Sequence, residues 1–223
     1  MNEIHIIMKP TVMNYGGLDI ALLPWITSEN YEESMNFIKN CKASILGGHL
    51  ELCGFDMMRG IQSHGGLDKN IFSRFETVIS GHYHTKSQQD NIMYLGTQME
   101  FFWSDAHDPK HFHVLDTETR EIEAIRNPFT LFEKIVYDDT SYNVDNLDEK
   151  FVKIVVVNKS DPFTFDRLCD RIQNKNIHEL KIAENFEEFI GERVGDEGVS
   201  IEDTTTLLDS YVDNVDTDLD KNR

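Results

Sequence analysis

The stretch Ala-Ser-Ile-Leu-Gly-Gly-His at residues 43–49 decides the fold, and Thr-Val-Ile-Ser-Gly-His-Tyr-His at residues 77–84 repeats its pattern. Each begins with a short apolar run and ends in glycine and histidine, which predicts a buried strand followed by a sharp turn. Ligand sites in open α/β sheets lie at the carboxyl ends of the strands. The two stretches therefore predict a layered sheet with His49, His82 and His84 gathered at one edge.

The chain around these stretches alternates strand-like and helix-like segments. Residues 3–8 and 19–24 are short apolar runs bounded by turn residues, typical of buried strands, and residues 31–41 have the pattern of a short helix. Crossover helices join strands that lie side by side, so this alternation favours an α/β core. Further strands are expected at residues 92–95, 111–116 and 121–125.

A second, smaller domain is expected over residues 129–190, after a first domain at residues 1–128. Asp161 and Pro162 mark the start of its helix, because a carboxylate accepts from free amide groups and proline fits the first helical position. The helix is expected to extend to residue 174. Strands of this domain are expected at residues 132–137, 151–157 and 179–182.

Composition narrows the class of protein. Hydrophobic residues make up 39% and charged residues 27% of the 223-residue chain, as in ordinary globular proteins. No run approaches the roughly 18 apolar residues that span a bilayer. The three cysteines, Cys41, Cys53 and Cys169, are far apart, which fits a reducing compartment such as the cytoplasm. A net charge of −19 repels nucleic acid on average, so DNA contact requires a local basic patch or a bound metal.

The three histidines have the spacing of metal ligands. His82 and His84 are two residues apart, so an extended backbone sends both imidazoles to the same side. His49 follows two glycines that allow the chain to turn sharply toward the same point. Neutral imidazoles bind manganese, zinc or iron. A His-x-His pair is also common in polar loops without a ligand, so the pattern by itself leaves both interpretations open.

These motifs and their surroundings resemble a known family. The two strand-to-histidine stretches resemble the last two metal motifs of calcineurin-like metallophosphoesterases. Residues 23–26, 92–97 and 110–116 resemble the corresponding stretches of SbcD-like nuclease subunits, most closely those of T-even phages. The resemblance runs through nearly the whole chain and matches the C-terminal two thirds of such subunits.

The resemblance implies a fold, a reaction and partners. The fold would be α/β: the C-terminal part of a phosphoesterase β-sandwich flanked by helices, plus a small α/β cap domain that contacts DNA. His49 and His82 would bind one divalent metal and His84 the other, the metals being manganese or magnesium. The implied function is endo- or exonucleolytic hydrolysis of DNA in recombination and repair. The implied partners are an SbcC-like ATPase, DNA and a second copy in a homodimer, in the cytoplasm of a phage-infected bacterium.

The chain departs from the family where half of the metal site should be. Family members open with Asp-x-His, Gly-Asp and Gly-Asn-His-Asp motifs, which supply oxygen ligands and a histidine that assists the leaving group, and this chain does not carry that series. Three imidazoles do not offset the repulsion between two divalent cations, and magnesium and manganese favour oxygen ligands. Glu51, Asp56 and Asp90 are interpreted as surface acids. We expect the chain alone to be inactive and an N-terminal complement of the same nuclease to restore the site. The alternative is a non-catalytic module that binds the ATPase or DNA.

Two other patterns have simpler structural interpretations. His111 and His113 alternate with Phe112 and Val114, so we interpret them as one face of a strand rather than a metal site. The aromatic run at residues 101–103 has no basic neighbours and is expected to pack in a core or a domain interface.

A basic row recurs every four residues on the helix of the second domain. The row consists of Arg167, Arg171 and Lys175, which could follow DNA phosphates. Asp166 and Asp170 lie beside it and can neutralise it, so a salt-bridged surface is an equal alternative.

The last 33 residues, 191–223, form an acidic tail with ten acidic and three basic side chains. Apolar residues recur there at spacings of three and four, which predicts an amphipathic helix that starts near Ser200. An isolated helix of this length is marginal in water, so its apolar side needs a partner. The resemblance suggests docking on the ATPase, and packing on the chain's own cap domain is the alternative. The apolar residues are Leu208, Tyr211, Val212, Val215 and Leu219.

Overall fold

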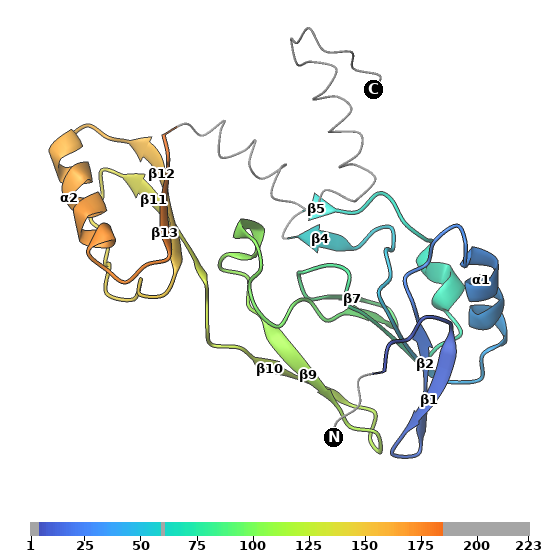
Figure 1. Ribbon diagram of the computed structural model, residues 1–223. Coiled ribbons are helices and arrows are strands. Elements are labelled where there is room, and N and C mark those ends of the chain that lie inside the picture. Colours follow the sequence, from blue (N-terminus) through green and yellow to red (C-terminus); the bar gives the residue numbers. More distant parts are fainter. Residues whose placement is uncertain (1–4, 59–60, 185–223) are drawn as a thin grey trace, which may run out of the picture. The chain divides into compact units, whose positions relative to one another are not determined.

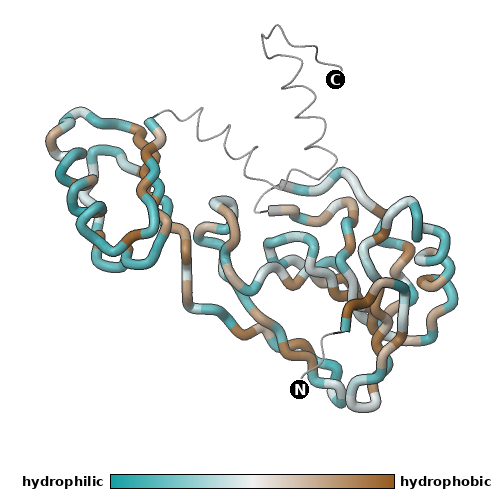
Figure 2. Tube along the Cα trace, in the orientation of Figure 1, coloured by the Kyte–Doolittle hydropathy of each residue, from teal (hydrophilic) through white to brown (hydrophobic). Residues whose placement is uncertain are grey.

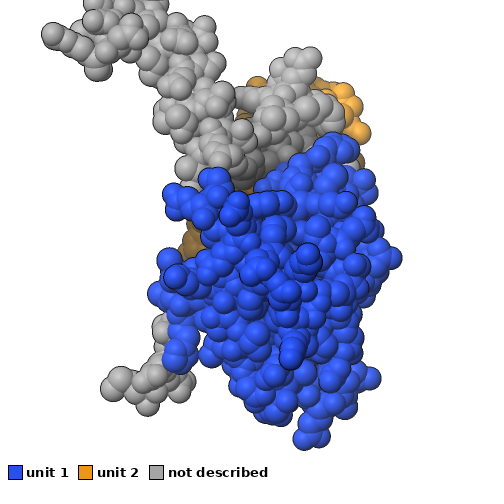
Figure 3. All heavy atoms as spheres, turned by 90° about the vertical axis from the view of Figure 1, so that its right-hand side faces the viewer, with its two compact units in different colours: residues 1–101, 105–131 blue, residues 102–104, 132–223 orange. Residues whose placement is uncertain are grey.

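The computed structural model describes residues 5–58 and 61–184 of the chain (Figure 1). The chain divides into two compact units (Figure 3). Unit 1 comprises Met1–Phe101 and Asp105–Leu131, and unit 2 comprises Phe102–Ser104 and Phe132–Arg223. Both units contain strands and helices, so the predicted α/β class is confirmed.

Unit 1 is built on a six-stranded sheet with the order β1-β2-β3-β6-β8-β7. The four central strands run parallel, and β1 and β7 form antiparallel edges. Helix α1, Tyr31–Asn40, connects β2 to β3. The strands are β1 Thr11–Tyr15, β2 Leu18–Leu23, β3 Ile45–Gly48, β6 Thr77–Ser80, β7 Ser87–Gln89 and β8 Ile92–Tyr94.

Hydrophobic residues gather along the strands of the sheets (Figure 2). In unit 1 the central strands bury Leu46 and Val78 completely, and Ile38 from α1 joins the same cluster. Fully burying a side chain of this kind stabilises a fold by about 1.5–3 kcal/mol. The apolar residues of the parallel strands thus form the core of unit 1, and polar residues follow at the ends of these strands.

The N-terminal strand differs from the prediction. Residues 5–8 form no strand, and Ile6 and Met8 are more than three quarters exposed, because no surface of the described chain covers them. The edge strand is instead β1, which pairs with β2 through a two-residue turn at Gly16 and Gly17. Both glycines have positive φ, at 58° and 89°, the conformation that tight hairpin turns require.

The rest of unit 1 consists of short elements and one ribbon. Strands β9, His111–Leu115, and β10, Ile122–Arg126, form a separate antiparallel ribbon. These strands confirm the predictions for this region, whereas the complete phosphoesterase sandwich stays a prediction. The short elements are β4 Asp56–Met58, β5 Ile61–Gln62, the 3₁₀ turn η1 Lys69–Phe72 and the turn η2 Trp103–Asp105, which spans the division between the units.

Unit 2 has three parallel strands, in the order β11-β12-β13, and one crossover helix. The strands are β11 Phe132–Asp138, β12 Phe151–Asn158 and β13 Glu179–Ala183, and the helix is α2 Pro162–Gln173. Asp161 caps the helix by accepting from the Phe163 amide at 3.1 Å, as predicted. Phe165, Leu168, Cys169 and Ile172 form its buried face.

Two buried tyrosines provide a matched test of hydrogen bonding in the two cores. The Tyr94 hydroxyl donates to the Leu50 carbonyl at 2.8 Å, whereas the Tyr137 hydroxyl has no hydrogen-bond partner among the described residues. We expect Tyr94→Phe to lower the free energy of unfolding by about 1 kcal/mol, because it removes a buried hydrogen bond. We expect Tyr137→Phe to leave it unchanged or raise it by up to about 1 kcal/mol, because no bond is lost.

Urea denaturation followed by tryptophan fluorescence measures both effects. Trp25 lies in unit 1 with Tyr94, and Trp103 lies in unit 2 with Tyr137. A clear loss of stability in Tyr137→Phe would show that this hydroxyl has a partner.

The described residues contain no helix long and apolar enough to cross a membrane. The predicted tail helix, with Leu208, Tyr211, Val212, Val215 and Leu219, lies outside the described residues.

Candidate metal centre

The candidate site lies where two neighbouring parallel strands end. β3 and β6 pair side by side, with Gly48 opposite Ser80, so the loops that follow leave the sheet at the same edge. His49 follows β3, and His82 and His84 follow β6. The structure brings the first two into direct contact, with Nδ1 of His82 3.2 Å from Nε2 of His49.

The base of this edge is held by buried hydrogen bonds to Leu50. The Ser80 hydroxyl accepts from the Leu50 amide at 2.9 Å and donates to its carbonyl at 3.2 Å. Tyr94 donates to the same carbonyl at 2.8 Å. Because Leu50 is adjacent to His49 and Ser80 is two residues before His82, these bonds fix the two histidine loops to each other.

The two contacting imidazoles are held in the neutral form. Burial, with the charge of His84 in addition, lowers the pKa of His49. Burial, followed by the charges of His49 and His84, lowers the pKa of His82 to about 4. Trp25 packs against both rings, with centroid distances of 5.4 Å to His49 and 4.9 Å to His82, and contributes to their burial. Neutral imidazoles have the lone pair that a metal ligand needs.

His84 has a different environment. Its Nδ1 lies 3.3 Å from both carboxylate oxygens of Asp105, which is 3% exposed. Lys110 donates to the same carboxylate at 2.9 Å, and the Phe101 amide donates to it at 2.9 Å. Burial alone would raise the pKa of Asp105, but hydrogen bonds from His84, Lys110 and Phe101 lower it well below its ordinary value. Asp105 is therefore an ionised carboxylate beside Nδ1 of His84.

Sequence reasoning missed Asp105, Lys110 and Trp25 as parts of this site. Asp105 lies 21 residues from His84 and has no motif around it, so only the fold brings the two together. Trp25 follows β2, whose end borders β3 at the same edge. Contacts between loops that are far apart in the sequence bring these residues together, and no local sequence pattern predicts such contacts.

The acidic residues that lie near the histidines in the sequence do not form a cluster of metal ligands with them. Within residues 5–58 and 61–184, no three histidine, cysteine, aspartate or glutamate side chains gather closely enough to hold a metal ion. Asp90 instead pairs with Lys69 at 2.8 Å. The three histidines form no such group either, and only His49 and His82 are in contact with each other among the described residues. They supply nitrogen atoms, without the oxygen ligands that a hard cation favours.

Two other patterns singled out by the sequence have the structural roles predicted for them. His111 and His113 share one face of β9, and Phe112 and Val114 are about half exposed on the other, as predicted. Trp103 is buried against Phe132, with ring centroids 4.9 Å apart.

The remaining aromatic and basic predictions are only partly matched. Phe101 and Phe102 are about half exposed, so they do not lie in a core, and the domain-interface alternative stays a prediction for these two. Arg167 and Arg171 are exposed on α2, whereas Lys175 lies beyond its end at Gln173.

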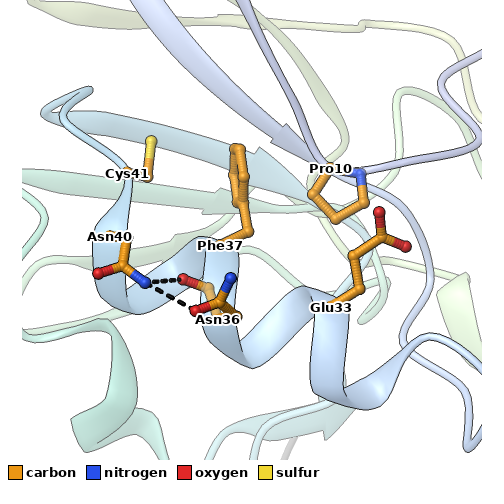
Figure 4. A pocket seen from close by; sticks show the side chains of 6 residues that line it. All are labelled: Pro10, Glu33, Asn36, Phe37, Asn40 and Cys41. Carbon is orange, nitrogen blue, oxygen red and sulfur yellow. Dashed lines mark hydrogen bonds between the residues drawn. The ribbon is translucent and has the colours of Figure 1, made fainter.

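A pocket between α1 and Pro10, which precedes β1, is lined by none of the three histidines (Figure 4). Its polar lining is partly engaged within the helix, because the Asn40 side chain donates to the Asn36 carbonyl at 2.9 Å and to the Asn36 side chain at 2.8 Å. Its lining residues are Pro10, Glu33, Asn36, Phe37, Asn40 and Cys41, and none is a predicted site residue.

The fold and this edge define an α/β protein with a histidine-rich site at the carboxyl ends of parallel strands. Over 206 residues the chain is 31% identical to exonuclease subunit 1 of Enterobacteria phage T4, which confirms the predicted match to a nuclease subunit of a T-even phage. The match covers 92% of this chain, and the chain spans 59% of the length of that relative. No family model matches the chain.

Proposed function

We propose that this chain is part of a DNA nuclease subunit that hydrolyses phosphodiester bonds with two divalent metals. The observation that carries the proposal is the neutral His49–His82 pair at the carboxyl ends of two parallel strands, with ring nitrogens 3.2 Å apart. The T4 relative is named an exonuclease subunit, which supports the reaction class.

The histidine pair fits a metal ion. Ligand atoms about 2.1 Å from a common cation lie about 3.0–3.4 Å from each other in octahedral or tetrahedral geometry. The ring nitrogens of His49 and His82 have that separation, which in the metal-free chain is a hydrogen bond between the two rings that a metal ion would replace. The pKa of each ring is lowered, which favours the neutral form. His84 would bind through Nε2, because its Nδ1 engages Asp105. When bound, manganese or magnesium supplies water activation and charge stabilisation for attack on a phosphate.

The chain's own residues contribute ligands and their support. His49, His82 and His84 present nitrogen atoms, Trp25 shields the first two from water, and Asp105 orients the third. The oxygen ligands and a group that assists the leaving group are to come from an N-terminal complement of the same nuclease. Within residues 5–58 and 61–184 no group of three potential ligands is assembled, so the proposal requires the complement to complete the site.

The partners follow from the same proposal. An SbcC-like ATPase and DNA would bind the completed subunit, and two copies would form a homodimer. The exposed Arg167 and Arg171 are the candidate DNA contacts on unit 2, and the acidic tail is the candidate ATPase contact. The strong negative charge of the chain restricts DNA to such local basic positions and to bound metals.

A non-catalytic module that binds the ATPase or DNA is the second candidate function. The observation in its favour is that no three potential metal ligands cluster in the described residues. Metal stoichiometry and nuclease activity distinguish the two candidates. A binding module takes up no metal at the histidine edge even after the complement is added.

We expect the 223-residue polypeptide by itself to have no manganese-dependent nuclease activity, because the described residues bring together no group of three metal ligands at the histidine pair. Addition of a polypeptide that carries the Asp-x-His and Gly-Asn-His-Asp motifs is expected to restore cleavage of single- or double-stranded DNA. Gel assays with and without manganese measure both. Cleavage by the lone polypeptide that disappears in His84→Ala would contradict the proposal, since a contaminating nuclease would not depend on His84.

A further inference from the structure

A buried ion pair lies behind His84. Asp105 and Lys110 are in contact at 2.9 Å, and their side chains are only 3% and 2% exposed. Burying two charges is unfavourable unless their remaining hydrogen bonds are satisfied. These are satisfied in part by Asp108, whose carboxylate lies 2.9 Å from the Lys110 ammonium group. Because packing alone does not favour a buried ion pair, a role of this pair is expected in its contacts with the neighbouring His84.

The ion pair contacts His84 at two points. Both carboxylate oxygens of Asp105 lie 3.3 Å from Nδ1 of the ring. Lys110 donates to the main-chain carbonyl of the same histidine at 3.1 Å. One partner therefore fixes the ring and the other fixes the backbone, so that the orientation of His84 depends on both.

The chemistry of the two contacts determines where the imidazole carries its hydrogen. A carboxylate that accepts from Lys110 is an acceptor only, so the ring atom facing it must be a donor. That atom is Nδ1, and in a neutral ring the lone pair then lies on Nε2. Carboxylates that accept from the second nitrogen of a histidine ligand fix its tautomer in metal sites.

We propose that Asp105 and Lys110 are positioning residues that hold His84 as the Nδ1–H tautomer and so present its Nε2 lone pair to a divalent cation. The divalent cation as the species bound rests on the proposed function, whereas the tautomer of His84 and its cause do not. The His49–His82 pair has no carboxylate partner among the hydrogen bonds of the described residues, so the ion pair acts on one of the three histidines alone.

The tautomer is measured directly on the 223-residue chain without metal or DNA. In a protein labelled with ¹⁵N-histidine, two-bond ¹H–¹⁵N correlation spectra at neutral pH distinguish Nδ1–H from Nε2–H rings, and His84→Gln assigns the signal. We expect His84 to be mainly Nδ1–H in the unmodified chain. In Asp105→Ala the preference should reverse toward Nε2–H, and Asp105→Asn, which keeps an acceptor oxygen, should retain part of it.

Asp90→Asn is the control, because it neutralises an exposed carboxylate of unit 1 that pairs with Lys69 and not with the Asp105–Lys110 ion pair. Its His84 tautomer should equal that of the unmodified chain. A merely structural ion pair predicts lower stability in the Asp105 variants with an unchanged tautomer. If Asp105→Ala does not fold, Asp105→Asn decides the question.

Two outcomes overturn the proposal. One is an Nε2–H ring in the unmodified chain, and the other is an unchanged Nδ1–H fraction in the Asp105 variants that fold. Because metal and DNA take no part in the measurement, failure of the proposed nuclease function would leave this result standing, and the reverse also holds.

Discussion

In the proposed complete nuclease, we expect His82→Ala to lower the rate of DNA cleavage by far more than about tenfold, the smallest loss usually seen when only a residue that supports a metal ligand is changed. The ring of His82 contacts His49 at 3.2 Å and packs against Trp25. Alanine removes one nitrogen of the pair and leaves His49 alone at the strand end. The rate of cleavage at saturating manganese measures the effect.

The control for this variant is His64→Ala, since His64 is exposed and lies outside the candidate site. It should change the rate less than twofold or so, as surface substitutions usually have small effects. A loss below tenfold in His82→Ala would mean that His82 is not a ligand. A similar loss in both variants would point to a general effect on folding.

The part of the site that lies at the ends of β3 and β6 could be predicted from the sequence. The glycines and histidines that follow two apolar runs indicated that two loops leave one edge, and β3 and β6 are indeed neighbours. The contact between His49 and His82 follows from that pairing. The carboxylate under His84 could not be predicted, because Asp105 reaches it only through a turn that has no periodic pattern.

The fold shows the same limit. The strand at residues 151–157 and the helix that starts after Asp161 were predicted because a continuous apolar run and a cap are local signals. The apolar residues of 3–8 predict the edge strand at the wrong segment, because the Gly16-Gly17 turn sets the hairpin and makes β1 the edge strand. Strands β4 and β5 have two or three residues and no pattern to detect.

Replacing Gly96 with alanine should lower the free energy of unfolding by about 3 kcal/mol or more, of which a left-handed backbone accounts for about 1–2 kcal/mol. Gly96 has a φ of +72°, and a Cβ atom there would lie 2.8 Å from the His84 carbonyl oxygen and 3.0 Å from the Lys86 amide nitrogen. These are backbone atoms, so they cannot rotate away as a side chain could. The same carbonyl accepts from Lys110 and from the Thr97 amide, and a shift of it would strain both bonds.

Gly54→Ala separates backbone strain from the close approach. Gly54 has a similar φ of +88°, but a Cβ atom there would have nothing within 4 Å. This variant should therefore show the left-handed penalty alone, about 1–2 kcal/mol. Urea denaturation followed by Trp25 fluorescence compares the two variants within unit 1. Equal losses would mean that the loop after β8 can move away from His84, whereas a larger loss in Gly96→Ala means that the packing of Gly96 against the His84 backbone is part of what fixes the third histidine in place.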